Sequence, residues 1–211
     1  ILNDIYGLTK YTIKATNQDL YVDSQGRERA PYEGDGLINA LSSYAFEDDY
    51  SLSRFSLEYL GNYPEWPAEY QLFCISWAWQ DYLYTGDASY LAEKYDQLKG
   101  KLYEGYFDGG VGLVKKPDKT LLIDWPATER DGYDSGVLYN TILNAVSVGA
   151  YEDMASIAEV LGKSADAESF RGRAETIRNS MISWLYNKDT GRFCDGLNSS
   201  GSASGHFSQH A

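Results

Sequence analysis

The chain has 211 residues, 43% of them hydrophobic and 15% aromatic, with a formal net charge of −13 at pH 7. This composition excludes an intrinsically disordered chain and predicts a folded domain. The acidic charge excludes nucleic acid and anionic membrane surfaces as expected partners, because phosphate binding needs clustered Lys and Arg. There is no run of 18 apolar residues, so no membrane-inserted helix is predicted, and the sequence indicates no compartment.

Helices dominate the predicted structure. Their expected ranges, in chain order, are 3–17, 34–47, 50–63, 69–86, 87–102, 134–162 and 164–186, with 134–162 forming one long helix or two short ones. In the fifth range, Leu91, Tyr95, Leu98 and Leu102 recur at helical spacing and predict one buried stripe. The last range has the same kind of stripe, formed by the apolar residues Phe170, Ala174, Ile177, Met181 and Leu185.

Glycine and a short polar residue mark the expected helix boundaries. Gly86 followed by Asp87, and Gly162 followed by Ser164, predict a glycine that ends one helix and an N-cap that starts the next. Such short links predict antiparallel helical hairpins. Asp35 is the predicted N-cap of the helix over 34–47.

Three stretches do not follow a helical period: 23–35, 108–134 and the tail from 192 onward. The middle stretch contains two short alternating segments around Pro117, which predict a small β-hairpin. Long non-helical loops in a helical array usually carry function. The Ser/Gly-rich tail is predicted to be a mobile loop.

The candidate chemistry depends on carboxylates. Motifs for phosphate binding, nucleophilic serine or zinc hydrolysis are absent, and the two cysteines, Cys74 and Cys194, are expected to be buried thiols without metal-ligand spacing. Glycoside hydrolysis needs a pair of Asp or Glu residues and little else, so no metal or organic cofactor is expected. The abundant Tyr and Trp side chains suit packing against a sugar ring.

The loop over 23–35, DSQGRERAPYEGD, concentrates charge around two glycines and a proline. An ordinary solvated loop would also look like this. The pattern nevertheless resembles the signature of the bacterial α-L-rhamnosidases, glycoside hydrolase family 78, in which a loop D-x-x-x-R-E-R-x-x-W/Y-x-G-D precedes a helix. The matching residues are Asp23, Arg27, Glu28, Arg29, Tyr32, Gly34 and Asp35.

Further segments follow in the order of that family, namely EWPAEYQLFCISWAWQDYLYTGD, LIDWPATERDGYD, MASIAEVLGKSADAESFRGRA and SQHA. The resemblance spans nearly the whole chain. It implies an all-α fold, an (α/α)6 toroid of six helical hairpins, of which residues 1–211 form part as a single, incomplete catalytic domain segment of a larger enzyme. The family is bacterial, with either cytoplasmic or exported members.

The resemblance also implies roles for individual residues. Glu28 is the expected general acid, and Asp23, Arg27 and Asp35 are expected to bind the hydroxyls of the sugar. A general acid must hold a proton near neutral pH, so the neighbouring arginines are expected to point away from Glu28, toward Asp23, Glu33 or substrate.

Aromatic residues are the candidates for the apolar wall that the methyl group of rhamnose requires. Tyr32, Asp124 and Trp125 are expected to contact substrate, and one of Trp66, Trp77 and Trp79 is expected to join them, Trp77 being the selected candidate. For Trp77 and Trp79 the competing interpretation is that they pack in the core. Trp184 is expected to pack in the core.

The remaining charged residues carry weaker hypotheses. Glu129, Arg130 and Asp131 either bind sugar or, as favoured here, pair among themselves, and His206 and His210 are expected to be solvated or locally hydrogen-bonded. The family resembles inverting glycosidases, and its general base lies beyond the SQHA segment. The 211 residues alone are therefore expected to be inactive, with the remainder of the polypeptide as their partner.

Three functions remain open. The first is removal of terminal α-L-rhamnose from a carbohydrate by an inverting acid/base mechanism. The second is another six-hairpin glycosidase, a uronyl hydrolase or a glucoamylase-like enzyme, which convergence of Arg27 and Arg130 in the pocket would favour. The third is a non-catalytic helical domain that binds glycan or protein, in which Glu28 has no cleft around it.

Overall fold

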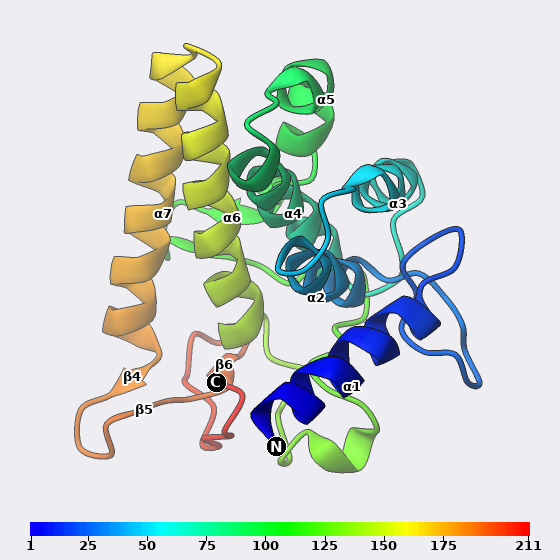
Figure 1. The fold of residues 1–211 in the computed structure, drawn as a ribbon. Coiled ribbons are helices and arrows are strands. Elements are labelled where there is room, and N and C mark those ends of the chain that lie inside the picture. Colours follow the sequence, from blue (N-terminus) through cyan, green and yellow to red (C-terminus); the bar gives the residue numbers. More distant parts are fainter.

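The computed structural model describes residues 1–211 and is mostly helical (Figure 1). The seven α-helices are α1 (Leu2–Thr16), α2 (Glu33–Tyr44), α3 (Ser51–Asn62), α4 (Tyr70–Thr85), α5 (Ser89–Lys99), α6 (Thr141–Val160) and α7 (Ser164–Trp184). Two short 3-10 helices, η1 (Glu104–Tyr106) and η2 (Ala127–Glu129), lie in the loop between α5 and α6. None of the seven α-helices combines the length and the hydropathy that a membrane-spanning helix requires.

The strands are two residues long and form three antiparallel pairs. They are β1 (Phe107–Asp108) with β2 (Leu113–Val114), β3 (Tyr139–Asn140) with β6 (Gly196–Leu197), and β4 (Tyr186–Asn187) with β5 (Arg192–Phe193). The expected small hairpin in the long loop is therefore present, but the prediction that it turns around Pro117 was wrong. The turn follows Asp108, whose carbonyl accepts the amide of Gly112, and Gly112 adopts a φ of +78° that suits glycine.

Successive helices form hairpins, and the hairpins stand side by side. The pairs are α2 with α3, α4 with α5 and α6 with α7, and α4 contacts both α2 and α6 (Figure 1). The helices α2, α4 and α6 therefore form an inner layer, and α3, α5 and α7 pack on its outer side. The segments that lead into α2 and α6 are long, over 17–32 and 100–140, whereas the α4–α5 and α6–α7 links span only 86–88 and 161–163. The long loops therefore gather at one end of the inner layer.

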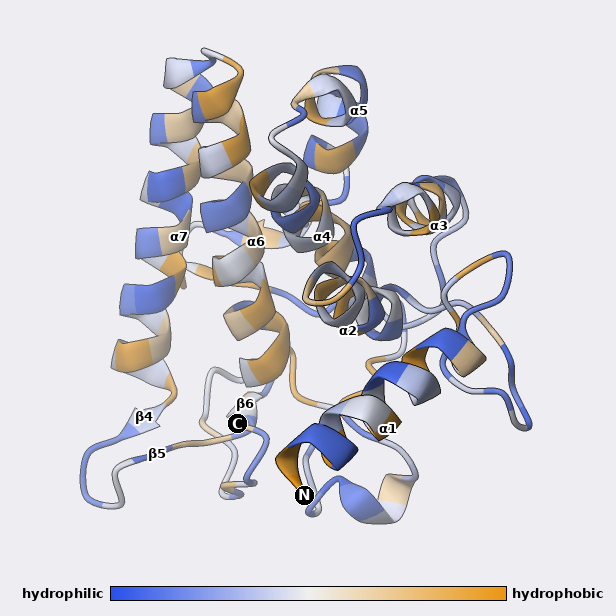
Figure 2. Ribbon diagram, in the orientation of Figure 1, coloured by the Kyte–Doolittle hydropathy of each residue, from blue (hydrophilic) through white to orange (hydrophobic).

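The inner helix α6 and the outer helix α7 differ in the fraction of their residues that is buried. Ten of the 20 residues of α6 are buried, but only five of the 21 residues of α7. The predicted stripe provides four of these five, Ala167 is the fifth, and its last member, Leu185, is buried just after the helix. The helix is otherwise largely hydrophilic (Figure 2). A narrow stripe suffices for a helix with one packed face, whereas α6 contacts α7 on one side and α4 on another.

The helix boundaries follow the predicted local signals in part. Gly86 ends α4 with a φ of +69°, and Gly162 follows α6 with a φ of +70°, as predicted. The carboxylate of Asp87 accepts the amide of Ser89 at 2.9 Å at the start of α5. The prediction for Asp35 was wrong, because α2 begins at Glu33 and Asp35 lies in its first turn.

The core contains Trp77 of α4, which has no exposed surface. Its indole stacks on Tyr21 with ring centroids 6.0 Å apart, and its Nε1 donates to the hydroxyl of Ser53 at 2.9 Å. The prediction that Trp77 contacts substrate is not supported by this position, because the indole packs on the face of α4 that is turned toward α2 and α3. The prediction that Trp184 packs in the core was wrong, since the residue is 52% exposed.

The C-terminal tail is fixed by hydrogen bonds and not free, contrary to the prediction of a mobile loop. Buried Asp195 accepts the amides of Asp134 at 2.7 Å and Ser208 at 3.1 Å, and its Oδ2 lies 2.8 Å from Nδ1 of His206. The buried thiols are as expected at Cys74 and Cys194.

The close approach of α2 and α4 predicts the effect of a single methyl group. In Gly36→Ala the new Cβ would lie 2.6 Å from Cη2 of the fully buried Trp77 ring. We expect overpacking to lower the free energy of unfolding by about 2 kcal/mol, measured by urea denaturation. Gly172→Ala in α7, where nothing lies within 4 Å of the new Cβ, is the matched control and should raise stability by up to about 1 kcal/mol. Equal effects of the two substitutions would contradict this packing.

Candidate functional site

Asp23 holds the charged loop over 23–35 in a closed turn. Its amide donates to the carbonyl of Ala30 at 3.0 Å, and its Oδ1 accepts the amide of Ala30 at 3.0 Å. Ser24 donates to the other carboxylate oxygen at 3.0 Å. Arg29 adopts a φ of +52° within this turn, and the loop then enters α2. The carboxylate of Asp23 therefore sets the shape of the segment that carries Glu28.

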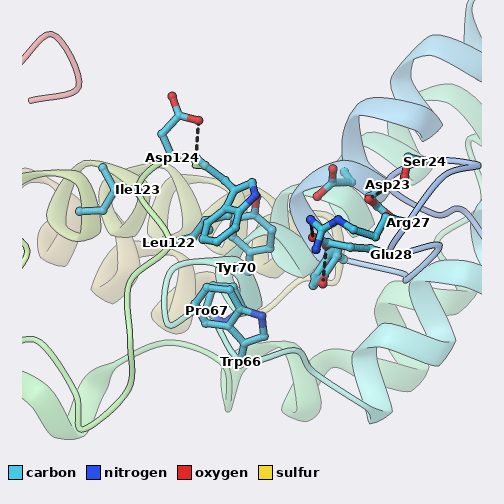
Figure 3. Close-up of a pocket in the computed structure, with 13 residues that line it drawn as sticks. Asp23, Ser24, Arg27, Glu28, Trp66, Pro67, Tyr70, Leu122, Ile123 and Asp124 are labelled. Atoms are coloured by element: carbon cyan, nitrogen blue, oxygen red, sulfur yellow. Dashed lines mark hydrogen bonds and ion pairs between the residues drawn. The ribbon is translucent and has the colours of Figure 1, made fainter. Parts of the chain in front are cut away.

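The loop over 23–35, the start of α4 and the segment over 122–125 line a cavity of about 550 Å³. Figure 3 shows Asp23, Arg27 and Glu28 on one side and Trp66, Pro67 and Tyr70 across from them. The lining residues are Asp23, Ser24, Arg27, Glu28, Tyr32, Asp35, Trp66, Pro67, Tyr70, Leu122, Ile123, Asp124 and Trp125. A smaller recess of about 310 Å³ adjoins it and shares Asp23, Asp35 and Tyr70 with it.

The structure brings together most of the side chains that the sequence selected. Seven of them, Asp23, Arg27, Glu28, Tyr32, Asp35, Asp124 and Trp125, line the cavity, and Trp77 does not. Trp66, which the sequence offered as an alternative to Trp77, lies in the loop before α4. It lines the cavity, and 46% of its surface is exposed. Tyr70, Leu122 and Ile123 were missed, although Tyr70 directly precedes the apolar helical pattern of α4.

Glu28 is bonded to two neighbours. Its Oε1 lies 2.7 Å from Nη2 of Arg27, and its Oε2 accepts the hydroxyl of Tyr32 at 3.0 Å. The expectation that Arg27 points away from Glu28 was therefore wrong for the free protein. The Arg27 side chain is 76% exposed, so water screens this ion pair and leaves it weak. Burial, together with the bond to Glu28, raises the pKa of Tyr32 to about 12.

Asp35 is the carboxylate whose environment disfavours charge. Partial burial raises its pKa, and the negative charges of Asp23 and Glu28 act in the same direction, while a backbone hydrogen bond opposes them. The ring of Tyr70 packs on Gly34, where a Cβ would lie 3.0 Å from Cζ. Burial and the charge of Asp35 raise the pKa of Tyr70. The cavity therefore has a desolvated acidic side.

Asp124 lies at the other end of the cavity, away from Glu28 and Asp23 (Figure 3). Its Oδ1 accepts the amide of Trp125 at 2.7 Å, and its Oδ2 lies 2.9 Å from Nε2 of His210. The hydrogen bond with His210 lowers the pKa of Asp124, helped by the Trp125 amide. The predicted local hydrogen bonding of His210 thus links the tail to the cavity wall.

Two buried carboxylates that do not line the cavity hold its walls. Glu33, with no exposed surface, accepts the amide of Glu65 at 3.1 Å, next to Trp66. Glu69, 3% exposed, accepts the amides of Leu122 at 2.7 Å and Ile123 at 3.0 Å. Burial raises the pKa of both groups, and backbone donors oppose it.

The second charged cluster does not pair among itself as expected. Nε of Arg130 donates to the carbonyl of Asp124 at 2.9 Å, and Asp131 accepts the amide of Gln209 at 2.9 Å. Glu129 is exposed. None of the three lines the cavity, so Arg27 and Arg130 do not converge there.

Comparisons with known proteins agree with this architecture. No curated protein sequence matches the chain. The structure is similar to a GH78 family rhamnosidase of Bacillus sp. GL1, with a TM-score of 0.83 and 19% identity over 95% of this chain and 22% of that chain. It is also similar to a rhamnosidase from Klebsiella oxytoca with rhamnose bound, with a TM-score of 0.74 and 16% identity over 95% of this chain and 41% of that chain.

The chain thus spans less than half the length of either solved relative, and at these identities the likeness establishes the fold. The family comparison is independent of the structure and covers residues 1–204. Paired inner and outer helices, long loops at one end and a carboxylate-lined cavity agree with it. The chain therefore belongs to the family of the bacterial alpha-L-rhamnosidase six-hairpin glycosidase domain.

Proposed function

We propose that this chain is part of an α-L-rhamnosidase that removes terminal α-L-rhamnose from a carbohydrate or glycoside with inversion. The observation that supports this most directly is the cavity itself, in which Asp23 and Glu28 face Trp66 and Tyr70 and whose lining includes the third carboxylate, Asp35. Carboxylates accept hydrogen bonds from sugar hydroxyls, and aromatic rings pack against the apolar side of a sugar. Membership of the family and the rhamnose bound in one relative favour this sugar over others.

The substrate is proposed to lie between the acidic loop and the aromatic wall. Asp23, Arg27 and Asp35 would bind ring hydroxyls, and Tyr32 and Asp124 would bind at the two ends of the cavity. The methyl group of rhamnose would face an apolar part of the wall, where Trp125 and Leu122 lie. Arg27 is the one arginine of the lining, which leaves no paired basic site for the carboxylate of a uronate.

Glu28 is proposed to act as general acid and protonate the departing glycosidic oxygen. In the free protein the guanidinium of Arg27 donates to Oε1 of Glu28, so the proposal requires Arg27 to leave Glu28 and bond to substrate hydroxyls instead. Once Arg27 has moved, the negative charges of Asp23 and Asp35 disfavour a third negative charge, on Glu28. Such a change in geometry on binding is common, because catalytic hydrogen bonds often form only in the complex.

The general base is proposed to come from the remainder of the polypeptide. An inverting mechanism places a second carboxylate about 6.5–9.5 Å from the acid, on the opposite face of the sugar, with water between them. The 211 residues cover 22% and 41% of the two solved relatives, and their seven helices are fewer than the twelve of six hairpins. We therefore propose that they form one incomplete catalytic domain segment, which is inactive alone.

Glu28→Gln in the full-length protein tests the role of the acid. We expect kcat for an alkyl α-L-rhamnoside to fall about 10²- to 10⁴-fold, because proton donation is lost. The loss should be much smaller for a dinitrophenyl rhamnoside, whose leaving group departs without a proton, and binding of rhamnose should persist. Glu129→Gln, an exposed carboxylate outside the cavity, is the control and should keep full activity. Unchanged turnover by Glu28→Gln would exclude the general-acid role.

Asp35→Asn tests the cost of the charge in the cavity. Because its folded pKa is raised, Asp35 favours folding below the ordinary Asp pKa, and this contribution is lost as pH rises through the raised value. Relative to the parent chain, Asp35→Asn should therefore gain stability from pH 3 to pH 7 while losing activity. Urea denaturation at both pH values measures this, with the exposed Asp118→Asn as control. A pH-independent difference would contradict the assigned electrostatics.

A further inference from the structure

Glu69 precedes α4 and is bonded to a segment far away in sequence. Its Oε1 accepts two successive amides, of Leu122 at 2.7 Å and of Ile123 at 3.0 Å, more than 50 residues farther along the chain. Leu122 and Ile123 line the cavity, and Asp124 and Trp125 follow directly. The amide of Ala68, adjacent to Glu69, also donates to the carbonyl of Thr120 at 2.9 Å. Ala68 and Glu69 therefore anchor the wall formed by Leu122–Trp125 to the start of α4.

The backbone at this attachment is strained. Ile123 adopts a φ of +63°, which is unfavourable for a β-branched residue. Such conformations persist only where the surrounding structure enforces them, and they cluster at binding and catalytic sites. The amide of Asp124 donates to the carbonyl of Leu122 at 2.8 Å across Ile123, and Glu69 accepts the amides of Leu122 and Ile123 in the same turn. The turn at Ile123 directs the chain so that Asp124 and Trp125 border the cavity.

The carboxylate of Glu69 is deeply buried and has few other partners. Only 3% of the residue is exposed, and its second oxygen, Oε2, has no hydrogen-bond donor. The backbone amides of Ile123, of Glu69 itself and of Leu122, followed by the positive charge of Arg130, favour the charged carboxylate and partly offset its burial, which raises the pKa. Arg130 itself donates to the carbonyl of Asp124, so charge and backbone geometry are coupled in the same segment.

We propose that Glu69 is a positioning residue, which holds the backbone of Leu122 and Ile123 so that Trp125 and Asp124 form the substrate-facing wall. This role rests on the proposed function, because it assigns that wall to binding of the sugar. Glu69 does not touch the substrate, and it acts through the segment that does. Its removal is therefore expected to weaken substrate binding more than it slows proton transfer from Glu28, which lies across the cavity (Figure 3).

The expected kinetic signature is a change in KM that exceeds the change in kcat. Glu69→Met removes both acceptors at similar side-chain length, and kcat/KM for 4-nitrophenyl α-L-rhamnoside should fall on the order of 100-fold, mostly through KM. Glu69→Gln retains one carbonyl oxygen and should restore a large part of this loss. Equal losses in the two variants, or a loss confined to kcat, would overturn the proposal.

A double-mutant cycle with Trp125→Ala separates positioning from general destabilisation. If Glu69 acts through the wall, Glu69→Met should reduce kcat/KM much less in the Trp125→Ala background than in the parent. Asp81→Asn is the matched control, because Asp81 is a 1% exposed carboxylate of α4 that bonds Arg54 and Tyr44 away from the cavity. It should lower stability and leave the effect of Trp125→Ala unchanged. Strict additivity of Glu69→Met and Trp125→Ala would refute positioning.

Hydrogen exchange tests the tether without reference to catalysis. In Glu69→Met the amides of Leu122 and Ile123 should exchange at least about tenfold faster, and in Asp81→Asn they should not. Unchanged exchange in Glu69→Met would overturn the tether even if activity fell. Accelerated exchange in a full-length protein that cleaves no rhamnoside would instead leave the tether in place and reject the proposed function.

Discussion

The contact between Gly36 of α2 and the indole of Trp77 of α4 is the constraint on which the site depends. Because Gly36 has no side chain, α2 approaches the fully buried ring more closely than any other residue would allow. The first residues of both helices lie at the same end of the inner layer, where Tyr32 and Asp35 meet Tyr70 across the cavity. This packing contact within the core therefore fixes the spacing of the two helices that carry Asp35 and Tyr70, while loops supply most of the cavity lining.

Buried carboxylates connect that rigid layer to the loops. Glu33 and Glu69 sit at the starts of α2 and α4 and accept amides from the segments that carry Trp66 and Trp125. A carboxylate accepting a backbone N–H forms a stronger hydrogen bond than a neutral acceptor does, which suits a loop that has to be held in a strained conformation. Asp195 uses the same device for the tail, where it accepts the amides of Asp134 and Ser208.

The charges of the site explain both its acidity and its dependence on substrate. Asp23, Glu28 and Asp35 share one side of the cavity, and Arg27 is their one cationic neighbour in the lining. In the free protein Arg27 pairs with Glu28, which relieves the repulsion among the carboxylates. A substrate rich in hydroxyls offers the guanidinium other acceptors, so the proposed acid changes its surroundings when the site fills.

Much of the fold followed from local patterns in the sequence. The stripes of α5 and α7, the glycines after α4 and α6 and the DSQGRERAPYEGD loop are each defined by neighbouring residues, so periodicity and turn chemistry predicted them. The resemblance carried by that loop also selected Asp23, Arg27, Glu28, Tyr32 and Asp35, which lie within one segment and line the cavity. Trp77 failed as a site residue because a helical period does not distinguish a ring that faces the core from one that faces a pocket.

The features that only the tertiary structure decided are contacts between segments far apart in the sequence. The amides that Glu69 accepts lie more than 50 residues away, and His210 reaches Asp124 across 86 residues. No local pattern marks such partners, because each is an ordinary polar residue until the fold brings the other beside it. The sequence by itself therefore determined the helices, the hairpins and the acidic loop, and it selected Asp124 and Trp125 of the opposite wall. The rest of that wall, and the carboxylates that hold it, were decided by contacts between distant segments.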